Sequence, residues 1–388
     1  MWYYQSMFER RLEELKRKDL ARSIISRSSS QGPAITINGR KYVNFSSNDY
    51  LGLAGHPEIV KAAVRAAERF GFGSGAARLL AGGSTLHEKL EKTISKFKLS
   101  ESALAFNSGY CANTGIIPAI SSEGDVIFSD ELNHASIVDG CRLSRAKTVV
   151  YRHRDMSHLE RLIKRGKARK RIVATDSVFS MDGDIAPLKD LSEICDRYGA
   201  LLYLDDAHGT GVLGNGRGAL AHFGIAVEPW ILQMGTFSKA LGSFGAFAAG
   251  NGGVIEWLMN SARSFIFSTA LPPCVVSASI AAITLVRKDP SLGNRLWANR
   301  ERLVEKFADI GYSIGGSETP IIPIMTGDVG EARRLSGFLW ENGIYAPAIR
   351  PPSVRQPRVR ITVTAAHTDR HLGLLVDALK RFKRRKKY

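Results

Sequence analysis

A lysine set in a loop of small and hydroxyl residues is the first feature of this sequence that could do chemistry. Lys239 lies in the run 235–242, GTFSKALG, directly after the apolar run 230–234, which predicts a buried strand. A lysine in a partly desolvated loop can lose its proton and react with a carbonyl group, and hydroxyl groups beside it can bind an anion. The same octapeptide is also typical of a solvated surface lysine, so the interpretation depends on the rest of the chain.

Other polar residues follow predicted strands in the same way. Asp205 and His208 come directly after the apolar run 201–204, and His134 comes shortly after 126–128. In a parallel sheet these strand ends meet at one edge, where ligands bind. Each residue also has a simpler interpretation. Asp205 can cap the turn that follows it, His208 can be a solvated turn residue, and His134 can be an ordinary residue at a helix N-terminus.

Apolar runs of strand length alternate with helical stretches through the middle of the chain. We predict strands at residues 103–106, 126–128, 148–151, 172–175, 201–204, 230–234 and 246–249. This alternation predicts an α/β fold with a mainly parallel sheet that is covered by helices on both faces. From about residue 290 the pattern changes to a compact α+β arrangement, with helices and strands at 295–310, 321–325, 330–342 and 359–363.

The sequence therefore predicts three parts. Residues 1–45 form a segment with an N-terminal amphipathic helix and a hairpin that turns at Asn38-Gly39. Residues 46–288 form a large α/β domain. Residues 289–388 form a small C-terminal α+β domain with a basic tail.

Together, the polar residues are the parts that a pyridoxal phosphate site needs. The turn at residues 108–110 lies between a predicted strand and a helix, and it offers free backbone N–H groups and a helix dipole to a phosphate. A buried carboxylate such as Asp205 can keep the cofactor's ring nitrogen protonated, which makes the ring an electron sink. His208 can donate to the phenolic oxygen, and His134 can lie flat on the ring.

These residues also lie in motifs by which the sequence resembles the fold-type I (aspartate aminotransferase-like) pyridoxal-phosphate enzymes, and within them the α-oxoamine synthases. The resemblance runs from about Asn44 to His367. The motifs that carry it are NFSSNDYLGL (44–53), GFGSG (71–75), LNHAS (132–136), VFSMDGD (178–184), DDAHGTGVLG (205–214), GTFSKALG (235–242) and IRPPS (349–353). The resemblance is strongest to the branch that forms 8-amino-7-oxononanoate, a biotin precursor. It implies a C-acyltransferase that condenses L-alanine with pimeloyl-CoA or pimeloyl-acyl carrier protein and releases carbon dioxide.

The resemblance implies a role for each matching residue at the cofactor. Lys239 forms the Schiff base, Asp205 pairs with the pyridinium nitrogen, and His208 contacts the phenolic oxygen. His134 stacks on the ring and completes the catalytic set. Further cofactor contacts fall on Gly109, Tyr110, Ser180 and Thr236.

The resemblance also implies substrate and subunit contacts. Arg22 and Ser353 match positions that touch the acyl substrate, and Asn48 and Arg360 match positions near the carboxylate of the amino acid, with His134 beside the substrate as well. Family members are homodimers with active sites at the interface. The segments 73–75 and 268–269 are therefore expected to serve the partner's cofactor.

Composition limits the other function classes. The chain has 388 residues, and 44% of them are hydrophobic, but no apolar run approaches the ~20 residues that a membrane span needs. The N-terminus has no signal-peptide pattern, and the four cysteines lie far apart without C-x-x-C spacing. The sequence therefore predicts a cytoplasmic protein that has no disulfide, no metal site and no membrane partner.

The formal net charge is +17. Seven of the basic residues lie in the tail Lys380–Tyr388, which contains no acidic residue. The simplest interpretation of this tail is a solvated, frayed segment. Alternatively, it attracts an anionic partner such as coenzyme A, an acidic carrier protein or nucleic acid. No nucleic-acid recognition motif accompanies it, so we expect no nucleic-acid partner.

Two alternative functions are considered. A sister α-oxoamine synthase would join glycine to acetyl-CoA, as a 2-amino-3-ketobutyrate CoA ligase, or serine to palmitoyl-CoA, as a serine palmitoyltransferase. A non-catalytic homologue would have lost Lys239 or Asp205, and both are present.

Overall fold

A computed structural model describes residues 3–385. The chain divides by its contacts into two compact units. The first, called the α/β unit, consists of Asn48–Ser180 and Asp184–Leu296, and the second, called the α+β unit, consists of the residues up to Ser47, Met181–Gly183 and the residues from Trp297. The division into 1–45, 46–288 and 289–388 stays a prediction. The contact grouping differs from it by joining the N-terminal residues to the C-terminal ones.

The α/β unit is built on a seven-stranded sheet with the strand order β3-β9-β8-β7-β6-β4-β5. Strands β8, β7, β6, β4 and β5 are parallel to their neighbours in that series, and β9 is antiparallel to both β3 and β8. The predicted mainly parallel sheet is confirmed. The strands are β3 (Ser102–Phe106), β4 (Val126–Asp130), β5 (Lys147–Tyr151), β6 (Arg171–Asp176), β7 (Ala200–Asp205), β8 (Ile231–Thr236) and β9 (Ala246–Gly250).

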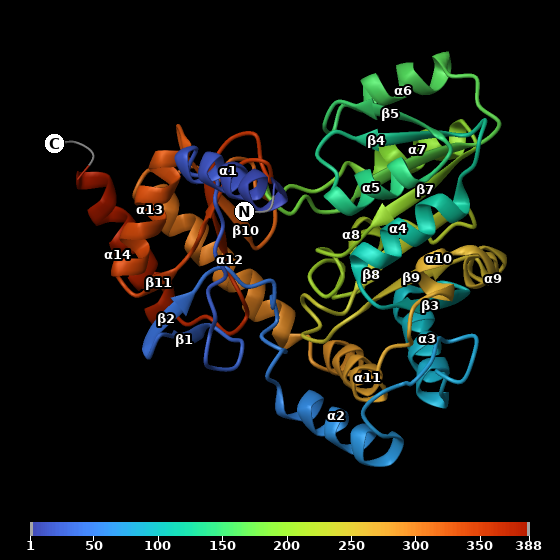
Figure 1. Ribbon diagram of the computed structural model, residues 1–388, viewed down its shortest axis with the longest axis horizontal. Coiled ribbons are helices and arrows are strands. Elements are labelled where there is room, and N and C mark those ends of the chain that lie inside the picture. The colour runs from blue at the N-terminus through green and yellow to red at the C-terminus, as the bar shows by residue number, and fades with distance from the viewer. Residues whose placement is uncertain (1–2, 386–388) are drawn as a thin grey trace. The chain divides into compact units, whose positions relative to one another are not determined.

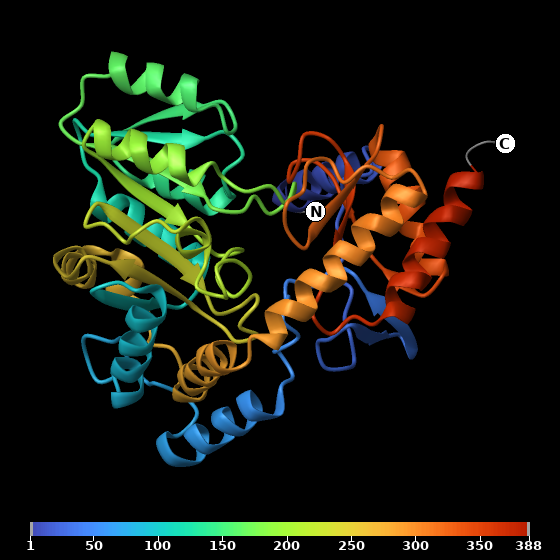
Figure 2. The ribbon, with the colours of Figure 1, turned by 180° about the vertical axis from the view of Figure 1, so that it is seen from behind.

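Helices cover both faces of this sheet, as predicted. One face packs on α4 (Gly109–Ile120), α5 (Ala135–Leu143), α9 (Gly252–Ser261) and α10 (Arg263–Ile266), as Figure 1 shows. Figure 2 shows α7 (Leu188–Arg197) on the other face. Strands β4, β8 and β9 are buried along their whole length because both of their faces are covered. The other helices of this unit are α2 (Pro57–Phe70), α3 (Thr85–Lys98), α6 (Met156–Arg165), α8 (Ala219–Phe223) and α11 (Pro273–Lys288).

The α+β unit contains two three-stranded sheets, with the orders β10-β13-β12 and β1-β2-β11. In the β1–β2 hairpin, Asn38 and Gly39 have φ values of 49° and 76°, which is the backbone that an Asn-Gly turn favours. The predicted hairpin is confirmed. The elements are β1 (Ala34–Ile37), β2 (Arg40–Asn44), β10 (Ile321–Met325), β11 (Ile344–Tyr345), β12 (Ala348–Ile349), β13 (Arg358–Thr362), α13 (Val329–Glu341) and α14 (Asp369–Arg385), while α12 (Ser291–Asp309) continues into this unit from the α/β unit.

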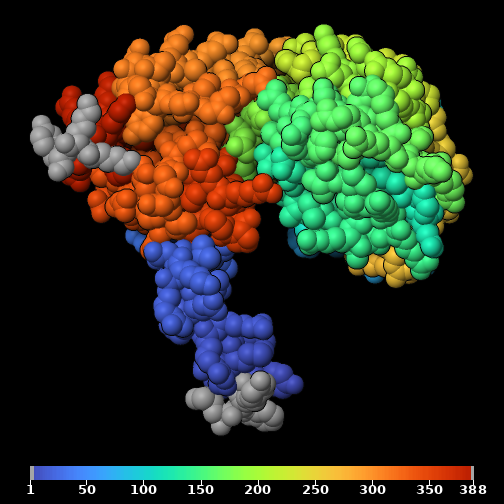
Figure 3. Space-filling view, turned by 90° about the horizontal axis from the view of Figure 1, so that it is seen from above, coloured from blue at the N-terminus to red at the C-terminus, as the bar shows by residue number. Residues whose placement is uncertain are grey.

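The N-terminal helix α1 (Tyr3–Arg17) exposes the apolar stripe that its sequence predicts. Phe8, Leu12 and Leu15 are 55%, 53% and 41% exposed. In Figure 3, α1 lies in the blue segment that projects from the orange and red residues of its own unit. An exposed stripe of this kind is typical of a surface that meets another protein.

The basic C-terminal segment is helical, so its interpretation as a frayed tail is wrong for residues 380–385. Helix α14 extends to Arg385. Lys383 Nζ donates to the carbonyl oxygens of Ile310 and Gly311, at 2.9 Å each, just beyond the end of α12. Phe382 also packs on Phe338, with 5.5 Å between ring centroids. Residues 386–388 lie outside the described part of the chain.

We expect Lys383→Ala to lower the free energy of unfolding by about 1 kcal/mol, because two carbonyls at a helix C-terminus lose a charged donor. Urea denaturation followed by circular dichroism measures the change. Lys380→Ala removes the same charge from an exposed position on α14 and should leave the stability unchanged. Equal effects of the two substitutions would contradict a specific capping role.

Candidate active site

The predicted cofactor residues converge at one edge of the seven-stranded sheet. Asp205 is the last residue of β7, and Lys239 follows β8 in the neighbouring position of the sheet. His134 follows β4, Ser180 follows β6, and Gly109 follows β3. Because all five strands end at this edge, the structure brings residues together that lie up to 130 positions apart in the sequence, from Gly109 to Lys239.

Asp205 is buried and held by neutral donors. Asn113 Nδ2 donates to Asp205 Oδ2 at 2.8 Å, and the backbone N–H of Ala207 donates to Asp205 Oδ1 at 3.0 Å. Tyr203 OH in turn donates to Asn113 Oδ1 at 2.5 Å. The Ala207 contact is the turn cap that the sequence offered as a simpler interpretation. It coexists with a carboxylate aimed into the sheet edge, because each oxygen has further lone pairs to offer.

Asp176 lies directly opposite Asp205 in the β6–β7 register, and sequence analysis did not single it out. Burial, and then the negative charge of Asp205, raise the pKa of Asp176 well above its usual value. The backbone N–H of His134 donates to Asp176 Oδ2 at 2.7 Å. Asp176 therefore acts as an acceptor that positions His134. Its place directly after the predicted strand 172–175 was a signal for it, but only the sheet order shows that it lies opposite Asp205.

His134 is both the N-cap of α5 and a member of the site. Its Nδ1 lies 2.7 Å from Ser136 Oγ, so the ordinary helix-terminal role that the sequence offered is present. Burial lowers the pKa of His134, the carboxylate of Asp205 opposes this shift, and the charge of Lys239 adds to it. The imidazole is neutral near pH 7.

His208 is buried, so its interpretation as a solvated turn residue is wrong. Tyr50 OH lies 2.6 Å from His208 Nδ1 and fixes the orientation of the ring. Tyr50 belongs to the motif at residues 44–53, but the sequence gave no reason to place it beside a residue 158 positions away.

The lysine loop is tightly constrained. Thr236 Oγ1 donates to the carbonyl of Gly245 at 2.7 Å and lies 2.7 Å from Ser238 Oγ. Gly242 has a φ of 60°, and a Cβ there would lie 2.4 Å from the backbone carbon of Leu53. Only glycine fits such a close approach. The Gly242 N–H donates to the carbonyl of Lys239 at 2.9 Å, so this contact holds the half-buried lysine in place.

The turn after Asp205 is anchored by a buried ion pair. Lys98 Nζ lies 2.7 Å from Asp206 Oδ2, and the two side chains are 1% and 0% exposed. Ser177 Oγ and Thr210 Oγ1 also donate to the Asp206 carboxylate, at 2.7 and 3.0 Å. Asp206 thus ties the end of α3 to the segments that follow β6 and β7.

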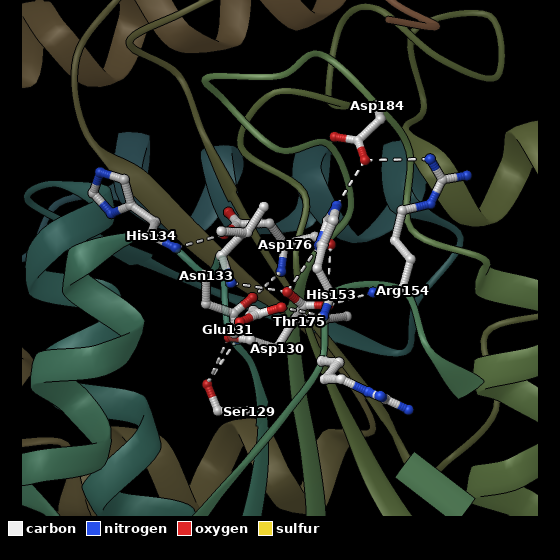
Figure 4. Close-up of polar contacts among 12 residues, drawn as sticks. Ser129, Asp130, Glu131, Asn133, His134, His153, Arg154, Thr175, Asp176 and Asp184 are labelled. Carbon is white, nitrogen blue, oxygen red and sulfur yellow. Dashed lines mark hydrogen bonds and ion pairs between the residues drawn. The ribbon is translucent and has the colours of Figure 1, made fainter. Parts of the chain in front are cut away.

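A second charged cluster holds the segment that carries Ser180. Figure 4 shows His153 between two carboxylates, with Nδ1 2.9 Å from Asp130 and Nε2 2.7 Å from Asp184. These carboxylates raise the pKa of His153 to about 9, although burial works against them. Arg154 adds a contact of 3.2 Å to Asp184. The imidazolium therefore joins the end of β4 to the hairpin that contains Ser180.

The remaining predicted positions fall in both units. Asn48 lies in the α/β unit, and Arg22, Ser353 and Arg360 lie in the α+β unit. Arg22 donates to Ser353 Oγ at 3.1 Å, so the two residues expected at the acyl substrate are in contact. The side chain of Tyr110 extends toward α5, where its hydroxyl donates to Asp139 Oδ2 at 2.5 Å.

The two segments expected to serve a partner's cofactor also lie together, in the α/β unit. Ala77, just after the glycine-rich run 73–75, bridges to Thr269 in the segment 268–269. Ser74 Oγ donates to the carbonyl of Leu271 at 2.7 Å. The roles of all these positions in binding stay predictions.

Comparison with known proteins decides the family. Residues 40–379 match the model of the aminotransferase class I and II family. The chain belongs to this family. A putative 8-amino-7-oxononanoate synthase from Thermodesulfovibrio yellowstonii is similar to it, with 52% identity over 96% of both chains. An 8-amino-7-oxononanoate synthase from Thermoanaerobacter pseudethanolicus is 47% identical over 96% of this chain and 95% of the other.

The fold of this aminotransferase-family chain is also found in a solved structure. A serine palmitoyltransferase from S. paucimobilis, with bound PLP–myriocin aldimine, matches with a TM-score of 0.92 and 28% identity over 97% of this chain and 96% of that chain. The predicted fold-type I architecture is therefore confirmed. Within residues 3–385, no helix combines the length and apolar character needed to cross a membrane.

The charge of His153 makes the stability of the protein depend on pH. A pKa that folding raises from 6.5 to about 9 stabilises the native state by at most about 3 kcal/mol, fully below pH 6.5. We expect this contribution to be lost as the pH rises through about 9. Urea denaturation of the wild type and His153→Gln at pH 6, 8 and 10 should give a stability difference that shrinks as pH rises.

The exposed His222 supplies the control for this experiment, since His222→Gln should show no such trend. A wild-type advantage over His153→Gln that stays constant from pH 6 to pH 10 would contradict the charged bridge.

Proposed function

We propose that the chain is an 8-amino-7-oxononanoate synthase, which condenses L-alanine with a pimeloyl thioester and releases carbon dioxide and the thiol. The observation that carries the proposal is identity of 47–52% over about 96% of the chain to proteins of that name. The sequence similarity to these relatives therefore favours the alanine-dependent enzyme.

The residues at the sheet edge fit pyridoxal 5′-phosphate. The Asp205 carboxylate accepts from the Asn113 amide and the Ala207 N–H, so it has lone pairs left to accept a further hydrogen bond from a pyridinium nitrogen. Thr236 and Ser238 place two hydroxyls beside the lysine loop, and the N-terminus of α4 offers backbone N–H groups at Gly109. This combination of one carboxylate, hydroxyl donors and an amine matches the charges of the cofactor. When bound, the cofactor supplies an electron sink for a carbanion at the α-carbon of the amino acid.

Each residue of the chain then has a defined task. Lys239 Nζ would hold the cofactor covalently, and its free amine would accept the α-proton of alanine. The Asp205 carboxylate would keep the proton on the ring nitrogen. The neutral imidazole of His134 would lie against the ring without adding charge. Tyr50 and His208 hold a hydrogen-bonding pair in place for the phenolic oxygen.

We expect the protein incubated with pyridoxal phosphate to keep a visible absorption band after gel filtration, to change that band with L-alanine, and to form 8-amino-7-oxononanoate from L-alanine and pimeloyl-CoA. Lys239→Ala should no longer retain the cofactor covalently. Its turnover should fall by about 10²–10⁴-fold, because the proton acceptor is removed. Absorbance and mass spectrometry of the product measure both. Product from glycine with acetyl-CoA or serine with palmitoyl-CoA, but none from alanine with pimeloyl-CoA, would assign a sister reaction instead.

The proposal extends to a cytoplasmic homodimer. Self-association is supported by the exposed apolar stripe of Phe8, Leu12 and Leu15 on α1. Burying such a stripe against a second subunit would remove apolar surface from water, which is favourable. We expect Phe8→Gln combined with Leu12→Gln to shift the protein toward the monomer in light scattering coupled to gel filtration. Arg10→Gln, on the opposite side of α1, should leave the mass unchanged. If the double variant keeps the wild-type mass, α1 is not part of the interface.

A further inference from the structure

The hairpin that carries Ser180 contributes residues to both units of the protein. Its stem belongs to the α/β unit, where Val178 forms an antiparallel bridge with Ile185. Its tip, residues 181–183, belongs to the α+β unit. Ser180 is the last residue before the tip, so a cofactor contact at Ser180 depends on what holds the tip in place.

Arg358, the first residue of β13, holds this tip. Its side chain is buried, and its Nη1 donates both to the carboxylate of Asp182 and to the carbonyl oxygen of Met181, the latter at 3.1 Å. Its Nε donates to the carbonyl oxygen of Gln356 at 3.2 Å. The guanidinium is therefore bound on one side to its own segment and on the other side to the hairpin tip. A buried charge of this kind depends strongly on its carboxylate partner.

Gly183, the third residue of the tip, is packed equally closely. It has a φ of 75°, and a Cβ there would lie 2.1 Å from the carbonyl oxygen of Ile321 on β10. The carbonyl oxygen of Gly183 accepts from Thr319 Oγ1 at 2.9 Å and from the backbone N–H of Glu318 at 3.0 Å. All three residues of the tip therefore have a specific contact within the α+β unit.

The aspartates on either side of Gly183 are bound by cations of different units. Asp182 pairs with Arg358 of the α+β unit. Asp184 pairs with His153 and Arg154 of the α/β unit, as Figure 4 shows. Without the first pair, only the stem side of the hairpin would be held by charge. The cost of ordering the segment beside Ser180 would then fall on the binding of a ligand there.

We propose that Arg358 is a positioning residue for the cofactor, which holds the hairpin tip and thereby makes cofactor affinity depend on the folded α+β unit. The inference rests on the proposed function, which requires pyridoxal 5′-phosphate and expects Ser180 to contact it. It adds a residue that lies outside the expected set of cofactor contacts. The coupling is reciprocal, so the bound cofactor also stabilises the held state of the tip by the same factor.

The first measurement is made on the full-length protein before cofactor is added. Hydrogen exchange of peptides that cover residues 177–186 reports how firmly the hairpin is held. Arg358→Met and Asp182→Asn should each exchange about 10-fold faster than the wild type in this segment, because a hydrogen bond between charged groups is lost. Arg334→Met removes the same charge from an exposed position of the same unit and should exchange like the wild type.

The second measurement adds pyridoxal phosphate to saturation. In the wild type, exchange of peptides from β10 and β13 should slow by about 5-fold or more, as expected for coupled sites. In Arg358→Met this slowing should disappear, and the dissociation constant of the cofactor, measured from its visible band, should rise by the same factor. Arg358→Lys keeps the charge but loses the planar fork, so it should give intermediate values.

A further variant separates positioning from general loss of stability. Ile361→Val trims a fully buried side chain of β13 without touching the tip, so it should lower the stability of the α+β unit and keep the wild-type cofactor affinity. A wild type and an Arg358→Met that bind the cofactor equally would overturn the proposal while the proposed function stands. So would an Ile361→Val whose cofactor affinity falls as far as that of Arg358→Met. A wild type that develops no visible band with pyridoxal phosphate would overturn the proposed function and this inference together.

Discussion

The buried ion pair between Lys98 and Asp206 is the contact on which the geometry of the sheet edge depends. Its two charges are almost completely withdrawn from water, so removing either partner would leave an uncompensated buried charge at a cost of about 3–5 kcal/mol. Asp206 is the next residue after Asp205, and its carboxylate also accepts from Ser177 and Thr210. The pair thereby fixes the direction in which the Asp205 carboxylate leaves the end of β7. Every residue proposed to hold the cofactor is positioned relative to that carboxylate.

Several site residues carry a structural contact and a chemical task at the same time. His134 caps α5 and offers a neutral imidazole, and Asp205 caps its own turn with one oxygen. The simpler interpretations that the sequence offered for these two residues therefore do not compete with the catalytic ones. A carboxylate or imidazole whose position is already fixed by a cap loses little conformational freedom when a ligand binds, which favours a pre-organised site.

The sequence predicted local features well, because strand-length apolar runs and the Asn38-Gly39 turn depend on neighbouring residues only. It predicted the set at the strand ends because parallel strands end at one edge. It could not predict pairings that depend on strand order, such as Asp176 beside Asp205. The bridge from His153 to Asp184 was equally hidden, because two loops meet there only after folding. The C-terminal segment is a similar case. Its basic composition indicated a solvated tail, but Lys383 binds the carbonyls of Ile310 and Gly311, which lie more than 70 residues earlier in the chain.

The discontinuous makeup of the α+β unit has a consequence for biosynthesis. Strand β2 completes its sheet only with β11, whose Ile344 pairs with Val43 about 300 residues later in the chain. At roughly 5–20 residues per second, a ribosome needs on the order of 15–60 s to make the intervening chain. During that time the β1–β2 hairpin is a two-stranded ribbon, which is marginal in water. Its apolar residues Ile35 and Tyr42 then lack the later part of their core. The nascent chain thus carries an early, half-built sheet until β11 emerges, in the last eighth of the sequence.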